Sequence, residues 1–179
     1  MRSLLEIRQQ NVIVQRWDVS CGAAALATVL SHQLGRPVSE RAVAQAMLGR
    51  TDPLRVKVRG GFSLLDLKRY AQSLGLQADG YANASLDDLD ELAPAIVPLT
   101  LFGFPHFVVY RGRVRDQILI ADPAFGNRML EVARFQQAWQ KIAFVVTQPQ
   151  ANAIVTTPRI EHQDYIRVSA DMIRSAARP

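Results

Sequence analysis

The segment Gln15–Leu30 reads QRWDVSCGAAALATVL and contains the one cysteine among the 179 residues of the chain. Cys21 stands where an irregular polar stretch changes into a run of small apolar residues, so we expect it at the start of a helix that ends near Gln33. Unpaired backbone N–H groups and the positive end of the helix dipole favour a thiolate at such a position. Cys21 is therefore a candidate nucleophile, although a lone free cysteine is also typical of inert core packing.

Length and composition indicate one globular domain without a membrane span. The chain is 49% hydrophobic and 21% charged, as in ordinary globular proteins, and it is long enough to bury a real core. The longest helix-like apolar run, Cys21–Leu30, is about half as long as a bilayer span requires. Residues 1–10 lack the apolar core of a secretory signal, so we expect no signal peptide in this sequence. One cysteine cannot form an internal disulfide, which leaves the redox compartment open.

The excess of basic residues, 21 Lys and Arg against 16 Asp and Glu, is spread along the chain. It forms only two local clusters, at 55–59 and 111–115, and neither has the aromatic spacing or zinc pattern of a nucleic-acid module. We interpret both as solvated surface and expect no nucleic-acid partner, since such a partner would require affinity that falls steeply with salt. One cysteine and three scattered histidines offer no ligand pair at the spacing of a metal site, so we expect no metal and no cofactor.

Helices are expected in the first half of the chain and strands in the second. Caps and apolar periodicity predict helices at 21–33, 40–48, 64–74 and 86–92. Residues 4–14 read as a leading strand or extended arm, and 50–61 as an irregular connection. A short strand at 76–81 precedes five runs rich in Val, Ile, Leu and Phe, with a short helix at 134–139 between the last two; these runs are 96–102, 106–111, 117–122, 128–132 and 141–147. This order predicts an α+β fold with an antiparallel sheet rather than an alternating doubly wound fold.

The C-terminal stretch differs from the rest of the chain. Residues 148–158 are polar, Thr-rich and bounded by prolines, as in a linker, and 164–178 have the apolar spacing of an amphipathic helix. We therefore assign residues 1–147 to one domain and 148–179 to a linker and a C-terminal helix. This helix must bury its apolar stripe against the domain, against a second copy of the chain in a homo-oligomer, or against a partner.

A cysteine nucleophile needs a base, and the chain has three histidines. His32 lies about 16 Å from Cys21 along the same expected helix, which is out of reach, and His162 lies in the tail. His106 follows Pro105 at the head of an expected strand, where its ring can project from the sheet edge into a cleft. We take His106 as the candidate base, with a half-buried structural histidine as the alternative.

Asp122 is the candidate third member of the site. Centring the hairpin that follows His106 on Val114 places Asp122 directly opposite His106. A carboxylate beside the imidazole would fix its tautomer and favour its protonated form. The alternative for Asp122 is a plain turn residue before Pro123.

Gln15, six residues before Cys21, is a candidate oxyanion donor. Its side-chain N–H beside the backbone N–H of Cys21 would give two donors for the oxyanion of a tetrahedral intermediate. Taken alone, a glutamine is usually just solvated.

These residues together resemble a known family. Gln15, Cys21-Gly22 before a small-residue helix, His106 followed by Phe-Val-Val, and Asp122 followed by Pro resemble the bacteriocin-processing cysteine peptidases, the double-glycine leader peptidase family of the papain-like clan. The resemblance covers about residues 11–147. It implies a papain-like fold, with N-terminal helices packed on a C-terminal antiparallel sheet, and assigns the nucleophile to Cys21, the base to His106, the orienting acid to Asp122 and the oxyanion donor to Gln15. Members commonly carry an acidic residue directly before the cysteine, whereas this chain has Ser20, a departure that concerns substrate preference more than chemistry.

The resemblance also implies a setting and an activity. In much of the family the peptidase is the front end of an ABC exporter, but this chain lacks both a membrane span and the GxxxxGK[ST] phosphate loop. A free-standing, tail-bearing member resembles the peptidase of bacterial functional-amyloid secretion systems, which is exported to the periplasm. The implied activity is a cysteine endopeptidase that cleaves a secreted or exported protein at small-residue, Gly-Gly-like sites and works with secretion-system components. The alternative is a catalytically silent peptidase-like module that binds a secretion substrate.

Overall fold

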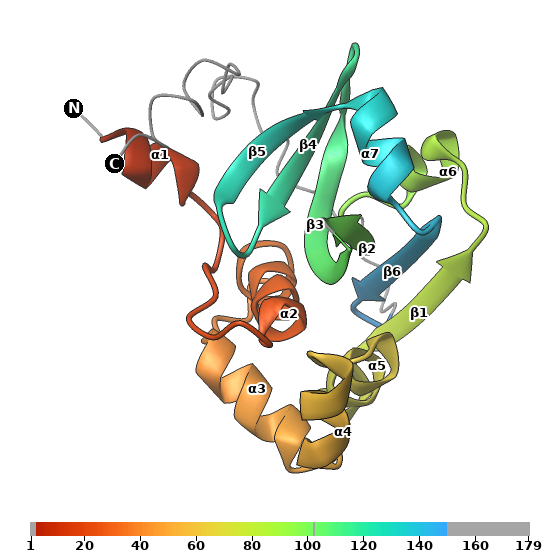
Figure 1. Ribbon diagram of the computed structural model, residues 1–179. Helices are drawn as coiled ribbons and strands as arrows, with labels where there is room; N and C mark the ends of the chain where they lie inside the picture. Colours follow the sequence, from red (N-terminus) through yellow and green to blue (C-terminus); the bar gives the residue numbers. More distant parts are fainter. Residues whose placement is uncertain (1–2, 102, 150–179) are drawn as a thin grey trace.

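The computed structural model describes residues 3–101 and 103–149 (Figure 1). The first half of the chain supplies most of the helices and the second half most of the strands. The elements in chain order are α1 (Leu4–Arg8), α2 (Cys21–His32), α3 (Glu40–Leu48), α4 (Pro53–Arg59), α5 (Leu64–Ser73), β1 (Gln77–Ala82), α6 (Leu86–Glu91), β2 (Ala95–Leu101), β3 (Phe104–Val114), β4 (Gln117–Asp122), β5 (Gly126–Glu131), α7 (Val132–Ala138) and β6 (Ile142–Thr147).

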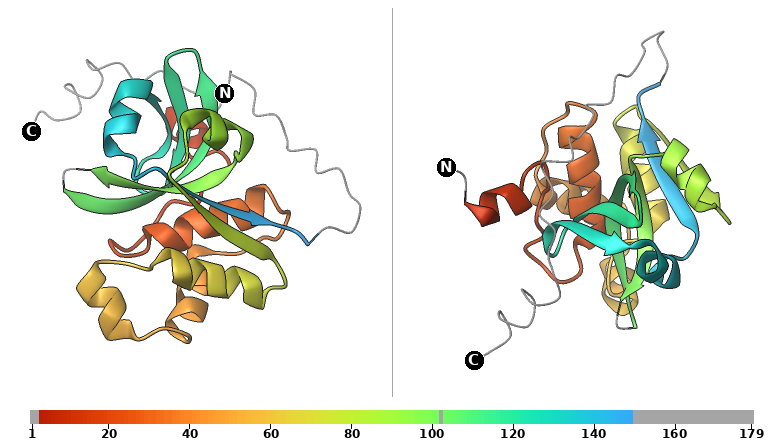
Figure 2. Two further views of the ribbon diagram at one scale, coloured as in Figure 1. Left: turned by 90° about the vertical axis from the view of Figure 1, so that its right-hand side faces the viewer. Right: turned by 90° about the horizontal axis from the view of Figure 1, so that it is seen from above.

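The six strands form one antiparallel sheet in the order β1-β6-β2-β3-β4-β5. Helices α2, α3 and α5 lie on one side of this sheet, and α6 and α7 lie on the other (Figure 2). Because side chains alternate along a strand, each central strand contributes to two cores. Val109 and Ala121 pack with the α2 side, whereas Val108 and Ile120 pack with Phe135 of α7. The predicted α+β fold with an antiparallel sheet is confirmed.

Helix α2 is the most deeply buried helix of the domain. Each of its residues from Cys21 to Leu30 is buried, and four of them are alanines. Small side chains let the helix approach the sheet closely: a Cβ added to Gly22 would lie 3.2 Å from Leu67 of α5 and 3.3 Å from Phe107 of β3. The start of α2 is therefore wedged between α5 and the sheet.

The cap signals in the sequence locate three further helices correctly. Ser39, Ser63 and Ser85 each accept a hydrogen bond from a backbone N–H in the first turn of α3, α5 and α6, and the last two form reciprocal capping boxes. The predicted short helix at 134–139 is present as α7, shifted by one or two residues.

Two predictions for irregular or extended chain are wrong. Residues 50–61 contain α4, because Asp52 caps its N-terminus, Pro53 occupies its first turn and Gly60 ends it in the left-handed conformation. The predicted strand or arm at 4–14 begins instead as α1. There the Ser3 N–H donates to Glu6 at 2.6 Å and the Glu6 N–H donates to the Ser3 hydroxyl at 3.2 Å, which is a capping box.

The predicted C-terminal helix and any oligomer contact that it makes lie outside the described residues. Within the described part of the chain, no helix combines the length and the apolar character that crossing a bilayer requires.

The close approach of α1 to the turn between β4 and β5 can be tested at Gly126. Gly126 has a φ of +83°, and a Cβ there would overlap the carbonyl oxygen of Arg8. We expect Gly126→Ala to lower the free energy of unfolding by about 2–4 kcal/mol, through left-handed strain plus displacement of α1. Gly35→Ala is the matched control, because Gly35 has a φ of +64° with open space around its Cα, and it should cost only about 1–2 kcal/mol. Urea denaturation measures both, and equal losses would show that the α1 contact contributes nothing.

Candidate active site

Cys21 is the first residue of α2 and is only 6% exposed. Its sulfur accepts hydrogen bonds from the backbone N–H groups of Gly22 and Phe107 and is also hydrogen-bonded to the His106 side chain. A helix N-terminus and two N–H donors all favour negative charge on the sulfur. The predicted position of Cys21 at a helix start is therefore what the structure shows.

His106 lies on β3 between Cys21 and Asp122. Its Nε2 lies 2.8 Å from Oδ1 of Asp122, so Nδ1 is the ring nitrogen left to face the sulfur. The side chain of His106 is 14% exposed and that of Asp122 is fully buried. The structure thus brings a thiol, an imidazole and a carboxylate into one hydrogen-bonded row, as a nucleophile, a base and an orienting acid require.

The predicted hairpin register is wrong, although His106 and Asp122 do meet. The strands pair Val109 with Ala121, so Asp122 continues opposite residue 108 and not residue 106. The error lies in the turn: Val114 pairs with Gln117, so the hairpin is centred between Arg115 and Asp116 and not on Val114, and the register shift between Tyr110 and Gly112 offsets only one residue of the difference. His106 reaches Asp122 as a diagonal neighbour, a separation that an aromatic ring spans.

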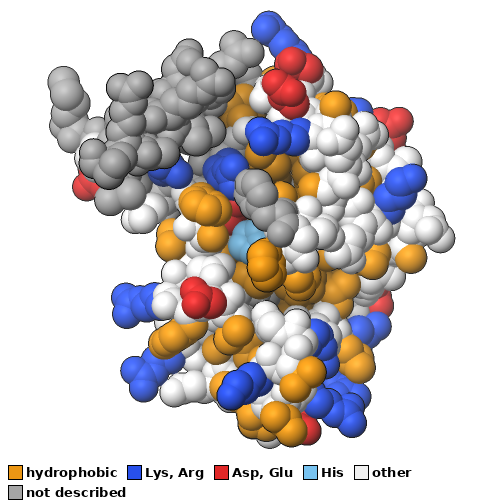
Figure 3. Space-filling model, in the orientation of Figure 1, with side chains coloured by type: hydrophobic (Ala, Val, Ile, Leu, Met, Phe, Trp, Pro, Cys, Tyr) orange, Lys and Arg blue, Asp and Glu red, His pale blue; other side chains and the backbone are white. Residues whose placement is uncertain are grey.

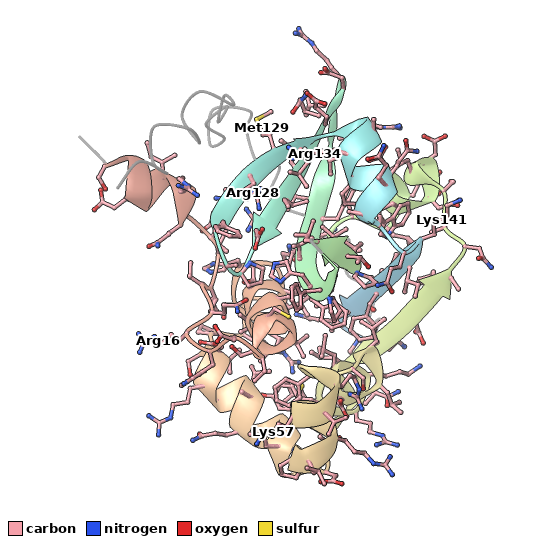
Figure 4. All side chains as sticks on the ribbon, in the orientation of Figure 1. Arg16, Lys57, Arg128, Met129, Arg134 and Lys141 are labelled. Atoms are coloured by element: carbon pink, nitrogen blue, oxygen red, sulfur yellow. The ribbon has the colours of Figure 1, made fainter. Side chains whose placement is uncertain are left out.

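Asp122 is held by three donors. Besides His106, the Ala124 N–H donates to its Oδ1 at 2.9 Å and Arg128 Nη1 donates to its Oδ2 at 2.9 Å. Arg128 comes from β5, where Figure 4 labels it near the end of β4, and its guanidinium lies 5.0 Å from the ring centroid of Phe125. Arg128 was not predicted as a site residue, because an arginine in a strand gives no sign that it will contact a buried carboxylate of the neighbouring strand.

The ionisation of the row follows from these contacts. Burial alone would raise the pKa of the Cys21 thiol, but the hydrogen bonds from His106 and from the Phe107 N–H bring it below its ordinary value. Burial alone would lower the pKa of His106, but its hydrogen bonds to Asp122 and Cys21 raise it to about 9. Burial likewise opposes ionisation of Asp122, yet His106, the Ala124 N–H and Arg128 lower its pKa. These contacts therefore favour the thiolate and the imidazolium, whereas burial alone would favour the neutral thiol and the neutral imidazole.

The backbone of Gln15 is hydrogen-bonded to the residue that follows Asp122. Its N–H donates to the carbonyl of Pro123 at 2.8 Å, directly after Asp122. Its side-chain Nε2 donates to the carbonyl of Trp17 at 3.0 Å. A carboxamide nitrogen carries two hydrogens, so one remains for another acceptor.

A cleft of about 350 Å³ opens next to Cys21. One wall is the segment 59–65 between α4 and α5, and the other is mostly apolar, formed by Pro98, Pro105, Phe107, Gln140 and Ile142. On the face drawn in Figure 3, a histidine lies recessed among hydrophobic side chains. Among the described residues, no group of three or more His, Cys, Asp or Glu side chains is placed to hold a metal ion.

Comparison with known proteins identifies the family. A model of the peptidase C39 family matches residues 9–151, most of the chain. The chain belongs to the peptidase C39 family. C39 proteins are cysteine peptidases, and the contact between Cys21 and His106 is consistent with membership of such a family. The resemblance noted from the sequence is thereby confirmed at the level of the family.

Relatives and solved structures agree with this C39 assignment. The chain is 38% identical over 162 residues to a probable functional amyloid protease, FapD, of Pseudomonas aeruginosa, with 88% of this chain and 71% of that protein covered. A double-glycine motif protease from an AMS/PCAT transporter, solved in complex with its leader peptide, superposes with a TM-score of 0.64 at 27% identity, covering 77% of this chain and 91% of that one. The peptidase domain of Streptococcus ComA gives the same TM-score at 23% identity, covering 77% and 98%. These structures confirm the papain-like fold of the C39 peptidase domains.

The ionisation of Cys21 can be tested by its rate of alkylation with iodoacetamide. Because His106 stabilises the thiolate, we expect the alkylation rate to rise at a lower pH than it does for an ordinary thiol. We expect His106→Ala to raise the pKa of Cys21 and so to lower the alkylation rate at pH 7 at least about tenfold. The ion pair should be lost as pH rises through about 9, where His106 loses its proton. His32→Ala, at the far end of α2, is the control and should leave the profile unchanged. An unchanged profile in His106→Ala would refute the pairing.

Proposed function

We propose that this C39 protein is an active cysteine endopeptidase in which Cys21 is the nucleophile, His106 the general acid and base, Asp122 the orienting acid and Gln15 an oxyanion donor. The observation that carries the proposal is the contact of Cys21 with His106 and of His106 with Asp122 at 2.8 Å. A silent binding module has no need of a buried thiol at a helix start with its pKa lowered by a neighbouring imidazole.

The proposed reaction uses these groups in sequence. The Cys21 thiolate attacks the scissile carbonyl carbon, and the negative charge passes to the carbonyl oxygen. The backbone N–H of Cys21 and the second hydrogen of the Gln15 amide stabilise this oxyanion. The C–N bond then breaks as protonated His106 gives its proton to the leaving amine. His106 finally deprotonates a water molecule that attacks the acyl carbon, and cleavage of the C–S bond releases the acid product and restores the thiolate beside protonated His106.

The substrate proposed for this site is an exported protein of a functional-amyloid secretion system, cut at a small-residue, Gly-Gly-like sequence. Likeness to the FapD proteins supports the system, and likeness to the double-glycine motif protease supports the cleavage site. The proposed compartment is the periplasm, as expected of such a system.

Cleavage is tested by incubating the protein with the exported proteins of its own secretion system and measuring intact masses. We expect the parent to produce two fragments from one of them and Cys21→Ala to produce none. A silent binding module would instead retain that protein on an affinity column without cleaving it, for the parent and Cys21→Ala alike. Fragments of equal yield from both would exclude Cys21 as the nucleophile.

The role of Gln15 makes a separate prediction. Gln15→Ala should lower kcat by about 10²–10³-fold, the effect of losing one oxyanion donor, while the alkylation rate of Cys21 by iodoacetamide stays within about twofold. Alkylation forms no oxyanion, so the two rates separate stabilisation of the intermediate from activation of the thiol. Gln15→Glu, which replaces a donor with acceptors, should be at least as slow. A matching loss in both rates would mean that Gln15 acts on the thiol instead.

A further inference from the structure

We infer that Glu40, a buried carboxylate on α3, is a positioning residue that sets the spacing between the oxyanion donor Gln15 and the nucleophile Cys21. The inference rests on the roles proposed for those two residues and adds a third residue, on another helix, that neither contacts the substrate nor belongs to the Cys21–His106–Asp122 row.

Glu40 contacts both ends of the loop that joins Gln15 to Cys21. The backbone N–H of Arg16 donates to its Oε1 and Oε2 at 3.0 and 3.1 Å. At the other end of the loop, the Ser20 hydroxyl donates to its Oε1. Arg16 directly follows Gln15 and Ser20 directly precedes Cys21, so one carboxylate is bonded to a neighbour of each proposed oxyanion donor.

At its Arg16 end, the loop is bonded to Glu40 through its backbone. The side chain of Arg16 points away from the molecule (Figure 4), and the bond comes from its main-chain N–H. A carboxylate that accepts from backbone N–H fixes the path of the chain, not merely the rotamer of one side chain. The same loop carries the Trp17 carbonyl, which accepts from Gln15 Nε2.

Ser20 is used in an unusual way for its position. It is the N-cap residue of α2, where a serine normally accepts a hydrogen bond from the first turn and stabilises the helix by about 1 kcal/mol. The Ser20 side chain makes no such cap and points instead to Glu40 and the Trp17 carbonyl. The first N–H groups of α2 are thereby left to the sulfur and, in the proposed reaction, to the oxyanion.

Glu40 is only 4% exposed. Burying a carboxylate is costly unless hydrogen bonds compensate for the lost water. The loop N–H, the Ser20 hydroxyl and the first turn of α3, where the helix dipole favours negative charge, supply that compensation. The carboxylate and the loop therefore stabilise each other, and shortening Glu40 would release both anchor points of the loop at once.

The consequence for catalysis is specific. A shift of about 1 Å in a positioned group can cost about 100-fold in rate, and such a shift here would move Gln15 relative to Cys21 without touching His106. Glu40 should therefore affect steps that form an oxyanion and spare those that need only the thiolate.

The test compares two reactions of the one cysteine in the full chain. Acylation by p-nitrophenyl acetate passes through an oxyanion, whereas alkylation by iodoacetamide does not. We expect Glu40→Ala to slow acylation at least tenfold and to change alkylation less than twofold. Glu40→Gln keeps one acceptor oxygen for one of the two anchors, so it should fall between the parent and Glu40→Ala. Asp88→Ala is the matched control, because Asp88 is also a first-turn carboxylate bonded to a serine but lies on α6, and it should leave both rates unchanged.

A double variant decides whether Glu40 acts through Gln15. In a Gln15→Ala background, Glu40→Ala should slow acylation by less than a further twofold, since the group that it positions is already gone. Three outcomes would overturn the inference. The first is that the losses in the double variant are fully multiplicative, and the second is that Glu40→Gln slows both reactions equally with an unchanged thermal midpoint. The third is that the parent is alkylated but not acylated. If the parent cleaves no exported protein while the acylation pattern holds, the proposed function fails and the positioning role stands.

Discussion

A buried thiolate and a buried imidazolium stabilise each other, and the rest of the site is arranged around that mutual dependence. Either ion alone would be neutralised by burial, since a low-dielectric surrounding disfavours charge. Together with Asp122 and Arg128 they form a row of alternating charge that has no net charge when all four groups are ionised. Such a row tolerates burial better than any of its parts. This explains why a fully buried carboxylate next to His106 also contacts a guanidinium.

The fold meets this constraint by bringing elements from distant parts of the chain to one end of the sheet. Helix α2 supplies the sulfur at its N-terminus, where the helix dipole and the backbone N–H groups add to the effect of the imidazolium. Strand β3 begins, β4 ends and β5 starts at the same place, so His106, Asp122 and Arg128 converge although they belong to three strands. The alanines of α2 matter here because only small side chains let the helix start lie this close to the strands.

Features set by local sequence were predictable, and those set by tertiary contacts were not. The serine caps of α3, α5 and α6 are short-range signals, so these helices were located almost to the residue, and the strand runs, which follow from composition, were located to within three residues. Helices α1 and α4 carry equally local signals, Ser3 with Glu6 and Asp52 before Pro53, but both are short and their apolar periodicity is weak. The register of the β3–β4 hairpin has no comparable signal, because Gly112 indicates an irregular strand without fixing where the turn lies.

The residues of the candidate site likewise fall into those that could be predicted from the sequence and those that could not. Cys21, His106, Asp122 and Gln15 could be named from the sequence, because few residues in the chain can serve as nucleophile or base and a family pattern orders the rest. Arg128 and Glu40 could not, because each acts on another residue and is recognisable only from what it touches. A buried carboxylate that accepts hydrogen bonds from backbone N–H groups produces no recognisable spacing of residue types in the sequence, since every residue type except proline has a backbone N–H. In a site of this kind, the groups proposed to perform the chemistry are therefore visible in the sequence, while those that hold them in position emerge only once the chain is folded.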